Sequence, residues 1–276
     1  MARDFTIVVA WPNQFTVALV AGCALAFLAL PIVIVIPMSF SSASTLAFPP
    51  PGLSLRWYQS FLEDPKWLQA AVNSAIIAAI ASTGAMILGT IAAYGLVRGS
   101  FPGKRLIESN FIAPLVVPPV VKAVALYIAY AKLGLLGTYG GLILAHMILG
   151  VPYVVILMSV AIRSFDVRIE QVAASLGAPF VTIFRRILLP NLAPSVIASW
   201  IMAFIVSFDE IIITFFVFGN RDTIPKRMFT LLEQKVDPTI TAIATMLIAI
   251  SVLTLVTTIW LLRRAGLIQR SSVNIS

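Results

Sequence analysis

The sequence contains a single cysteine, Cys23, and a single histidine, His146, among its 276 residues. One cysteine excludes an intrachain disulfide, a thiolate metal cluster and a redox pair. The chain also has no HExxH pattern, no GxSxG pattern and no clustered histidines, so it offers none of the usual arrangements of a hydrolase or metalloenzyme. We therefore expect a protein that is not an enzyme and that holds no metal or cofactor of its own.

Charged residues are scarce as well. Only 11% of the residues are charged, whereas 60% are hydrophobic, and the mean hydropathy is +1.00. A soluble domain of this length would not keep such a balance in water, so the composition indicates a membrane protein. The net charge of +8 would suggest nucleic acid in a soluble protein, but here the basic residues flank apolar stretches. We expect no nucleic-acid partner.

Apolar stretches are long enough to cross hydrocarbon about 30 Å thick, which takes roughly 20 residues per helix. The sequence therefore predicts an all-α integral membrane protein with about six transmembrane helices, the first retained rather than cleaved as a signal peptide. The predicted spans are residues 15–38, 70–97, 111–131, 140–162, 193–218 and 240–262. They form one transmembrane domain, 15–262, between a short N-terminal segment, 1–14, and a C-terminal tail, 263–276.

Lysine and arginine indicate the orientation of these spans. Basic residues flank one set of loops and the C-terminal end, namely Arg98, Lys104, Arg105, Arg163, Arg168, Arg185, Arg186, Arg263, Arg264 and Arg270. By the positive-inside rule, these loops and both termini face the cytoplasm.

Three prolines mark the third predicted span: Pro114, Pro118 and Pro119. Proline removes a backbone donor and does not continue a regular helix, so the first half of this span should be kinked or unwound. Such backbone is tolerated in a membrane only against protein or water. Two interpretations remain open: a helix that lines a solute path, and a kinked helix that only packs.

Two acids, Asp209 and Glu210, follow Phe208 within the fifth predicted span. An ionised side chain there is costly unless it meets a partner or water. Adjacent residues differ by about 100° around a helix, so both acids would not face one pore axis. One hypothesis is that Asp209 or Glu210 lines the route of a cationic solute. The alternative is a structural salt bridge with Lys122 of the third span. For His146, a packing role is favoured over a proton relay.

The most informative segment is the loop 163–190, which contains EQVAASLGAPFVTIFRRILLP. Asp166 can N-cap a short helix that runs to about Leu176. Gly177 then suits the end of this helix, and Pro179 suits the first turn of a second one. The loop is thus expected to form a helix, a turn and a helix outside the bilayer.

Small or modest side chains occupy the first of these short helices: Val172, Ala173, Ala174 and Ser175. They would let the helix approach another protein surface closely, which favours a docking role. The alternative is an amphipathic hairpin on the lipid headgroups, with Arg185 and Arg186 bound to phosphates.

The spacing in this loop resembles the coupling-loop motif of binding-protein-dependent ABC importer permeases: EAA, three residues, Gly, nine residues, Ile, one residue, Leu-Pro. Gln171, Val172 and Ala173 occupy the EAA positions, and Gly177, Ile187, Leu189 and Pro190 occupy the others. The departures are Gln171 in place of glutamate and Val172 in place of alanine; the adjacent Glu170 is then expected to serve the same partner. The segments GLSLRWYQSFLEDPKWLQAAVNS from Gly52 and SFDEIIITFF from Ser207 resemble the polyamine-type branch of the family.

The resemblance implies a type I ABC importer transmembrane fold with a cytoplasmic coupling helix, in a multi-pass subunit of the bacterial inner membrane. It implies half of a pore, completed by a second permease of different sequence, with two copies of an ATPase and an extracytoplasmic binding protein. The implied coupling residues are Glu170, Gln171, Val172, Ala173, Ala174, Ser175, Gly177, Ile187, Leu189 and Pro190. The candidates for the solute path are Pro118, Pro119, Lys122, Phe208, Asp209 and Glu210.

ATP and Mg²⁺ are expected on the ATPase partners. The nearest phosphate-loop lookalike, GSFPGKR from Gly99, has the wrong glycine spacing and Arg105 where Ser or Thr is required. The implied solute is a small cation such as putrescine or spermidine, with opines, amino acids and phosphonates as alternatives. An ion-coupled secondary transporter would predict inverted repeats or matching broken helices, which the sequence does not display.

Overall fold

The computed structural model describes residues 13–234 and 237–264. Its elements are α1 (Gln14–Ser39), α2 (Arg56–Glu63), α3 (Pro65–Arg98), α4 (Lys104–Val116), α5 (Pro119–Leu133), α6 (Tyr139–Ser164), α7 (Val167–Ser175), α8 (Phe180–Thr182), η1 (Ile183–Leu188), α9 (Leu189–Asn191), α10 (Ala193–Phe208), α11 (Ile212–Val217), α12 (Ile224–Gln234) and α13 (Thr239–Arg264). Over these residues the only β-pairing is an isolated bridge between Ser41 and Leu53. The prediction of an all-α fold is confirmed. The predicted terminal segments, 1–14 and 263–276, lie almost wholly outside the described residues.

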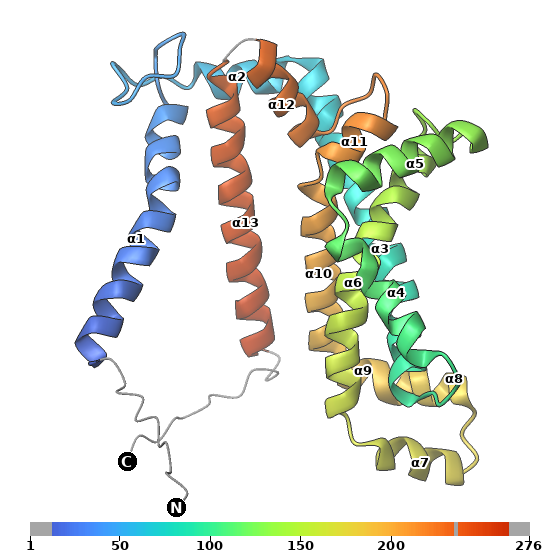
Figure 1. Ribbon diagram of the computed structural model, residues 1–276. Helices are drawn as coiled ribbons and strands as arrows, with labels where there is room; N and C mark the ends of the chain where they lie inside the picture. Colours follow the sequence, from blue (N-terminus) through green and yellow to red (C-terminus); the bar gives the residue numbers. More distant parts are fainter. Residues whose placement is uncertain (1–12, 235–236, 265–276) are drawn as a thin grey trace, which may run out of the picture. The chain divides into compact units, whose positions relative to one another are not determined.

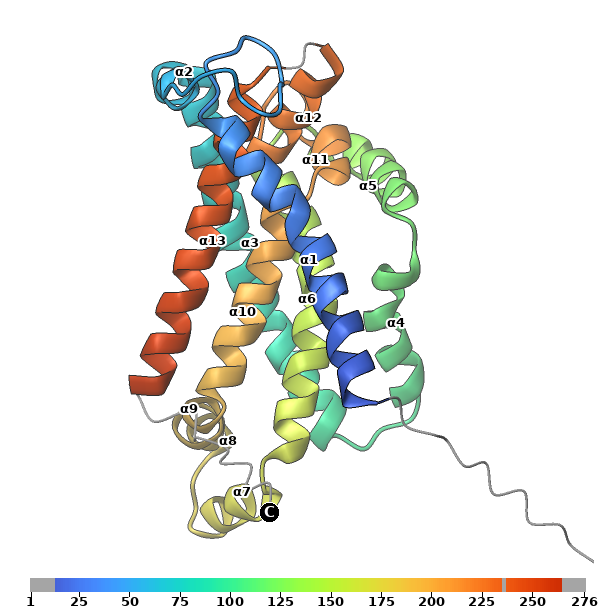
Figure 2. The same cartoon turned by 90° about the vertical axis from the view of Figure 1, so that its left-hand side faces the viewer.

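The chain divides into two units. One contains α1, α2 and α13 as far as Leu253, and the other contains α3 to α12. In the second unit, α3, α6 and α10 lie side by side, with α7 at one end and α11 and α12 at the opposite end (Figures 1 and 2). In the first unit, the segment after α1 folds back on α2: the hydroxyl groups of Ser39 and Tyr58 are 2.7 Å apart, and Trp57 Nε1 donates to the Ser41 carbonyl at 3.0 Å.

Length and composition qualify three of the described helices as membrane spans: α1, α3 and α6. Two bent pairs raise the number to five. In one pair, α4 and α5, the chain bends by 106°. In the other, the segment Phe180–Asn191 and α10, it bends by 80°. The sixth predicted span lies within α13, of which Thr239–Leu253 is a shorter apolar helix. A membrane fold of several apolar helices is therefore confirmed.

Two of the predicted spans are not single helices. The third breaks at Val117 and Pro118, and α5 starts at Pro119, so the expected distortion by proline is confirmed. The fifth was predicted as one helix over 193–218, which is wrong: α10 ends at Phe208 and α11 begins at Ile212. The segment is largely hydrophobic, but the helix is interrupted, because the residues between α10 and α11 cap the two helix ends.

A seam of small residues lets α3 pack closely against α6. Small side chains recur every four positions on α3 and are buried: Ala81, Ala85, Gly89 and Ala93. A Cβ atom at Gly89 would lie 2.7 Å from the Cβ of Val154 on α6, so only glycine fits there. Small residues at helix contacts are the usual means of close packing in membranes, where lipid is as apolar as the side chains.

His146 of α6 is buried in the second unit. Its Nδ1 lies 2.8 Å from the Ser207 hydroxyl of α10, and its Nε2 lies 3.1 Å from the Thr214 hydroxyl of α11. Both ring nitrogens therefore have hydroxyl partners, and the ring connects α6 to the helices on either side of the break after Phe208. The packing role predicted for this histidine fits these contacts.

Replacing His146 with leucine should destabilise the protein by about 2 kcal/mol, because a buried Ser207 hydroxyl then loses its partner. His146→Gln, which retains a donor and an acceptor, should recover part of that loss. Heating the purified protein in detergent and measuring the fraction that stays monodisperse would check both variants. Equal stability of His146→Leu and wild type would refute a structural role for the two hydrogen bonds.

Candidate functional site

The loop between α6 and α10 forms the expected short helix. Asp166 is the N-cap of α7, and its Oδ1 accepts a hydrogen bond from the Arg168 amide at 2.9 Å. The helix ends at Ser175, and Gly177 follows with a φ of +85°, a left-handed conformation that favours glycine. The amide of Gly177 bonds to the Ala174 carbonyl at 2.9 Å. The predicted helix and its glycine end are both present.

The second arm of the loop is less regular than expected. Pro179 is the N-cap of α8 rather than part of its first turn, and a π-helical turn, η1, separates α8 from α9. In this arm Ile183 and Leu188 are buried, and they attach it to the rest of the unit. Of the motif positions here, Ile187 and Leu189 are half-buried, and Pro190 is exposed.

Glu170, which was expected to serve an ATPase partner, is buried against its own chain. Its Oε1 accepts from Nε and Nη2 of Arg98 at 3.0 and 2.7 Å, and its Oε2 accepts from the Tyr94 hydroxyl at 2.9 Å. Arg98 Nη2 also donates to the Phe165 carbonyl at 2.9 Å. Both carboxylate oxygens are therefore engaged by the last turns of α3. Sequence reasoning placed Arg98 only as a topology signal and missed its ion pair.

Aromatic rings attach the second arm of the loop to the end of α3 as well. The centroid of the Tyr94 ring lies 5.3 Å from that of Phe180. It lies 5.6 Å from that of Phe184, in an edge-to-face arrangement. Such ring contacts contribute beyond the area they bury. Tyr94 and Arg98 thus hold both arms of the loop against the end of α3.

Part of the remaining surface of the loop is apolar and exposed. Gln171, Val172, Ala174 and Ser175 face outward, and the side chain of Leu176 is 83% exposed. Phe180 and Val181 of the second arm are also more than half exposed. An exposed apolar patch on a rigidly held element marks a surface for another protein or a membrane.

The break between α10 and α11 gives its two acids different surroundings. Glu210 Oε1 accepts from the Ile213 amide at 2.9 Å and so caps the first turn of α11. Asp209 is the C-cap of α10, and its carboxylate is exposed, with no hydrogen bond or ion pair to the residues described. The two acids therefore lie between two helices, whereas the sequence analysis placed them within one continuous span.

The salt bridge between Lys122 and one of these acids, which was the alternative interpretation, is absent from the described residues. Instead, Lys122 Nζ donates to the Pro114 carbonyl at 2.9 Å. Proline at position 118 has no N–H to offer that carbonyl, so the lysine compensates for a backbone bond lost at the helix break. Pro118 and Pro119 are exposed at this break, and Phe208 is half-buried at the end of α10.

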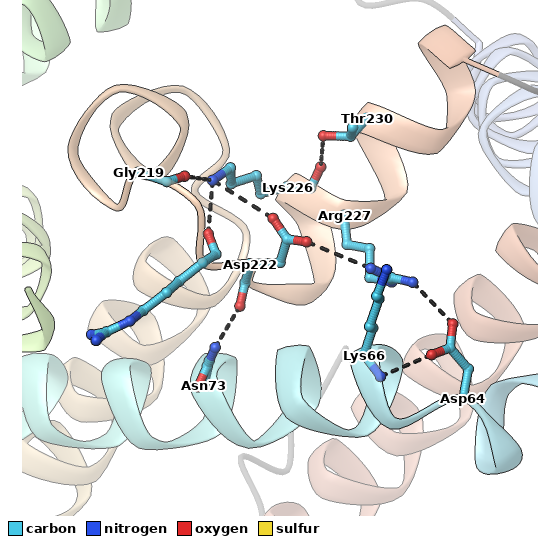
Figure 3. A network of polar contacts seen from close by, with 9 residues as sticks. Asp64, Lys66, Asn73, Gly219, Asp222, Lys226, Arg227 and Thr230 are labelled. Carbon is cyan, nitrogen blue, oxygen red and sulfur yellow. Dashed lines mark hydrogen bonds and ion pairs between the residues drawn. The ribbon is translucent and has the colours of Figure 1, made fainter. Parts of the chain in front are cut away.

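A polar network at the opposite end of the second unit was not predicted (Figure 3). Asn73 of α3 donates to the Asp222 carbonyl at 2.7 Å, and Arg227 pairs with Asp64 at 2.9 Å and with Asp222 at 3.6 Å. Lys226 Nζ donates to the carbonyls of Gly219 and Arg221 at 2.6 and 2.7 Å. Burial lowers the pKa of the Lys226 ammonium, and the Asp222 carboxylate opposes part of that shift. The network holds the loop before α12 against the start of α3.

Comparison with known proteins adds to this geometry. Residues 85–265 match the family described as binding-protein-dependent transport system inner membrane component. The spermidine/putrescine transport system permease protein PotC of Haemophilus influenzae is 33% identical over 227 residues, which are 82% of this chain and 88% of that protein. The putrescine transport system permease protein PotI of Escherichia coli is 36% identical over 234 residues, with coverages of 80% and 82%.

Two further similarities are more limited, one in the length that is matched and the other in sequence identity. The molybdenum transport system permease protein ModB of Escherichia coli is 33% identical over 189 residues, which are 62% of this chain and 82% of that protein. The crystal structure of a bacterial ABC transporter involved in the import of the acidic polysaccharide alginate contains a chain with the same fold. The TM-score is 0.68 at 16% sequence identity, over 91% of this chain and 95% of that one.

Proposed function

This chain belongs to the family of binding-protein-dependent transport system inner membrane components, and on that premise we propose that it forms half of the translocation pore of an ATP-driven importer for a small cationic amine. As a type I ABC importer permease, it is a multi-pass inner-membrane subunit and not an enzyme in itself. The other half of the pore is a second permease of different sequence. Two ATPase subunits bind ATP and Mg²⁺, and an extracytoplasmic binding protein delivers the solute.

The attachment of the loop 163–190 to α3 is the observation that carries this proposal. The exposed face of α7 docks on an ATPase subunit at the cytoplasmic side. The positive-inside rule assigns this loop and both termini to that side. When the ATPase subunits close, they displace α7. Because Glu170 is bound to Arg98, the displacement passes to α3, which is one continuous helix of 34 residues. The pore then changes the side to which it opens.

A cationic solute is supported by two observations. The relatives PotC and PotI are named as permeases for spermidine and putrescine or for putrescine. The exposed carboxylate of Asp209, next to a break in the helix, offers a negative charge to a positive solute. ModB, named for molybdenum transport, makes a molybdenum-containing solute the alternative.

Reconstitution with its partners would test the function. The subunit is purified with the ATPase and second permease that accompany it and placed in liposomes. Uptake and ATP hydrolysis are then measured with binding protein and putrescine, spermidine or molybdate. Hydrolysis stimulated by an amine is the expected result. Stimulation by molybdate alone would refute the cationic solute, and uptake without any ATPase would refute the importer.

We expect Gly177→Ala to lower amine-stimulated hydrolysis about fivefold. The left-handed conformation at this position costs alanine about 1 kcal/mol, so the end of α7 would relax into another backbone and change its docking face. Gly95→Ala is a matched control, because Gly95 lies within α3, and a Cβ atom there meets no neighbour within 4 Å. The control should hydrolyse ATP as the wild type does. Equal rates for both variants would contradict the requirement for this turn.

A further inference from the structure

A hollow of about 520 Å³ lies at the ends of α3 and α6 and the beginning of α4. It is lined by Leu96, Val97, Lys104, Arg105, Glu108 and Arg163. Three of these side chains are cationic and one is anionic, so the lining has a formal charge of +2. The hollow lies outside the coupling contacts of Glu170 and apart from the acids after α10.

The cations of this hollow are only partly neutralised. Arg163 Nη2 lies 3.3 Å from Glu108 Oε1, and Lys104 Nζ donates to the Gly99 carbonyl at 3.1 Å. Arg105 is exposed, and its guanidinium makes no hydrogen bond or ion pair with another described residue. Over the described chain, no acid therefore pairs with Lys104 or Arg105.

The backbone adds positive potential at the same place. Helix α4 begins at Lys104 after Gly103, and no side chain caps its first turn. The first amides of a helix carry partial positive charge and favour an anion. The segment GSFPGKR does not fit a nucleotide phosphate loop, but its last two residues bring two cations to a helix start on the wall of the hollow.

An apolar surface continues from the hollow along α4. None of the side chains of α4 is fully buried, and those of Leu106 and Val116 are 76% and 80% exposed. The helix is half of a bent pair that is apolar enough to lie in a membrane. Cations at the end of such a helix suit the phosphate of a phospholipid, and the exposed apolar side chains along the helix suit its acyl chains.

We propose that this hollow binds the headgroup phosphate of an anionic glycerophospholipid, whose acyl chains lie along α4. Basic pockets between membrane helices take up such headgroups. Lys104 and Arg105 contact the phosphate, together with the first amides of α4. A free phosphate ion would use the same cations but would gain nothing from the apolar face.

Binding of phosphatidylglycerol to the complete purified transporter would test the site. Native mass spectrometry counts bound lipid as phosphatidylglycerol is titrated into the detergent. The double variant Lys104→Gln and Arg105→Gln should bind it about thirtyfold more weakly. Glu108→Gln, which removes the one carboxylate, should bind it several-fold more tightly.

Arg185→Gln with Arg186→Gln is the charge-matched control, because both arginines are exposed on η1 outside the hollow. This control should retain the lipid. Unchanged binding by the Lys104 and Arg105 double variant would overturn the proposal, as would an equal loss in the control. Inorganic phosphate that displaces phosphatidylglycerol at equal concentration would also overturn it and assign the hollow to free phosphate.

Discussion

Glu170→Ala is expected to lower solute uptake about a hundredfold in an assembled transporter. The side chains of Arg98 and Glu170 are only 19% and 8% exposed, so the substitution leaves a poorly solvated guanidinium without its counter-charge. Removing one partner of a buried ion pair costs about 3–5 kcal/mol, and the lower figure corresponds to about a hundredfold in population. Helix α7 would then detach from α3. Uptake into proteoliposomes, measured together with ATP hydrolysis, gives the number of solutes moved per ATP.

Two further variants show whether the effect belongs to the ion pair. Glu63→Ala removes an exposed glutamate outside the loop, and uptake should stay within about twofold of the wild type. Replacing both Arg98 and Glu170 with methionine removes the unpaired charge and should recover a large part of the uptake, because apolar substitutes for a buried pair are often tolerated. Wild-type uptake by Glu170→Ala would show that the loop moves α3 by other contacts.

Asp209→Asn should reduce uptake of a cationic amine about thirtyfold. A carboxylate at the C-terminus of a helix faces the negative end of the helix dipole, so Asp209 is unfavourable for α10 itself. An acid that is exposed and has no described partner is available to a cation. At a few ångströms and intermediate dielectric constant, opposite charges attract by about 2–4 kcal/mol, which is ample for this loss.

Glu210→Gln is the matched control for that experiment. A glutamine oxygen can still accept from the Ile213 amide, so the cap of α11 survives and uptake should fall no more than about threefold. Initial rates are measured at saturating binding protein for spermidine and putrescine. A larger loss in Glu210→Gln than in Asp209→Asn would reverse the roles assigned to the two acids. No loss in either variant would remove the break after α10 from the solute path.

The sequence itself determined the solvent, the fold class and the family. Long apolar stretches need a bilayer whatever their arrangement, and local signals were sufficient for the loop. Asp166 caps α7 and Gly177 ends it because both effects depend on neighbouring backbone atoms only. The proline break in the third span has the same local origin.

Contacts between distant residues were decided by the tertiary structure alone. Glu170 and Arg98 are 72 positions apart, so the sequence did not show that the glutamate faces its own α3. The end of helix α10 at Phe208 is different, because the Glu210 side chain that bonds to the Ile213 amide acts locally, and hydrophobicity alone did not reveal it. The partners of His146 depend on which helices meet in the packed unit. Composition and short-range spacing do not contain that information.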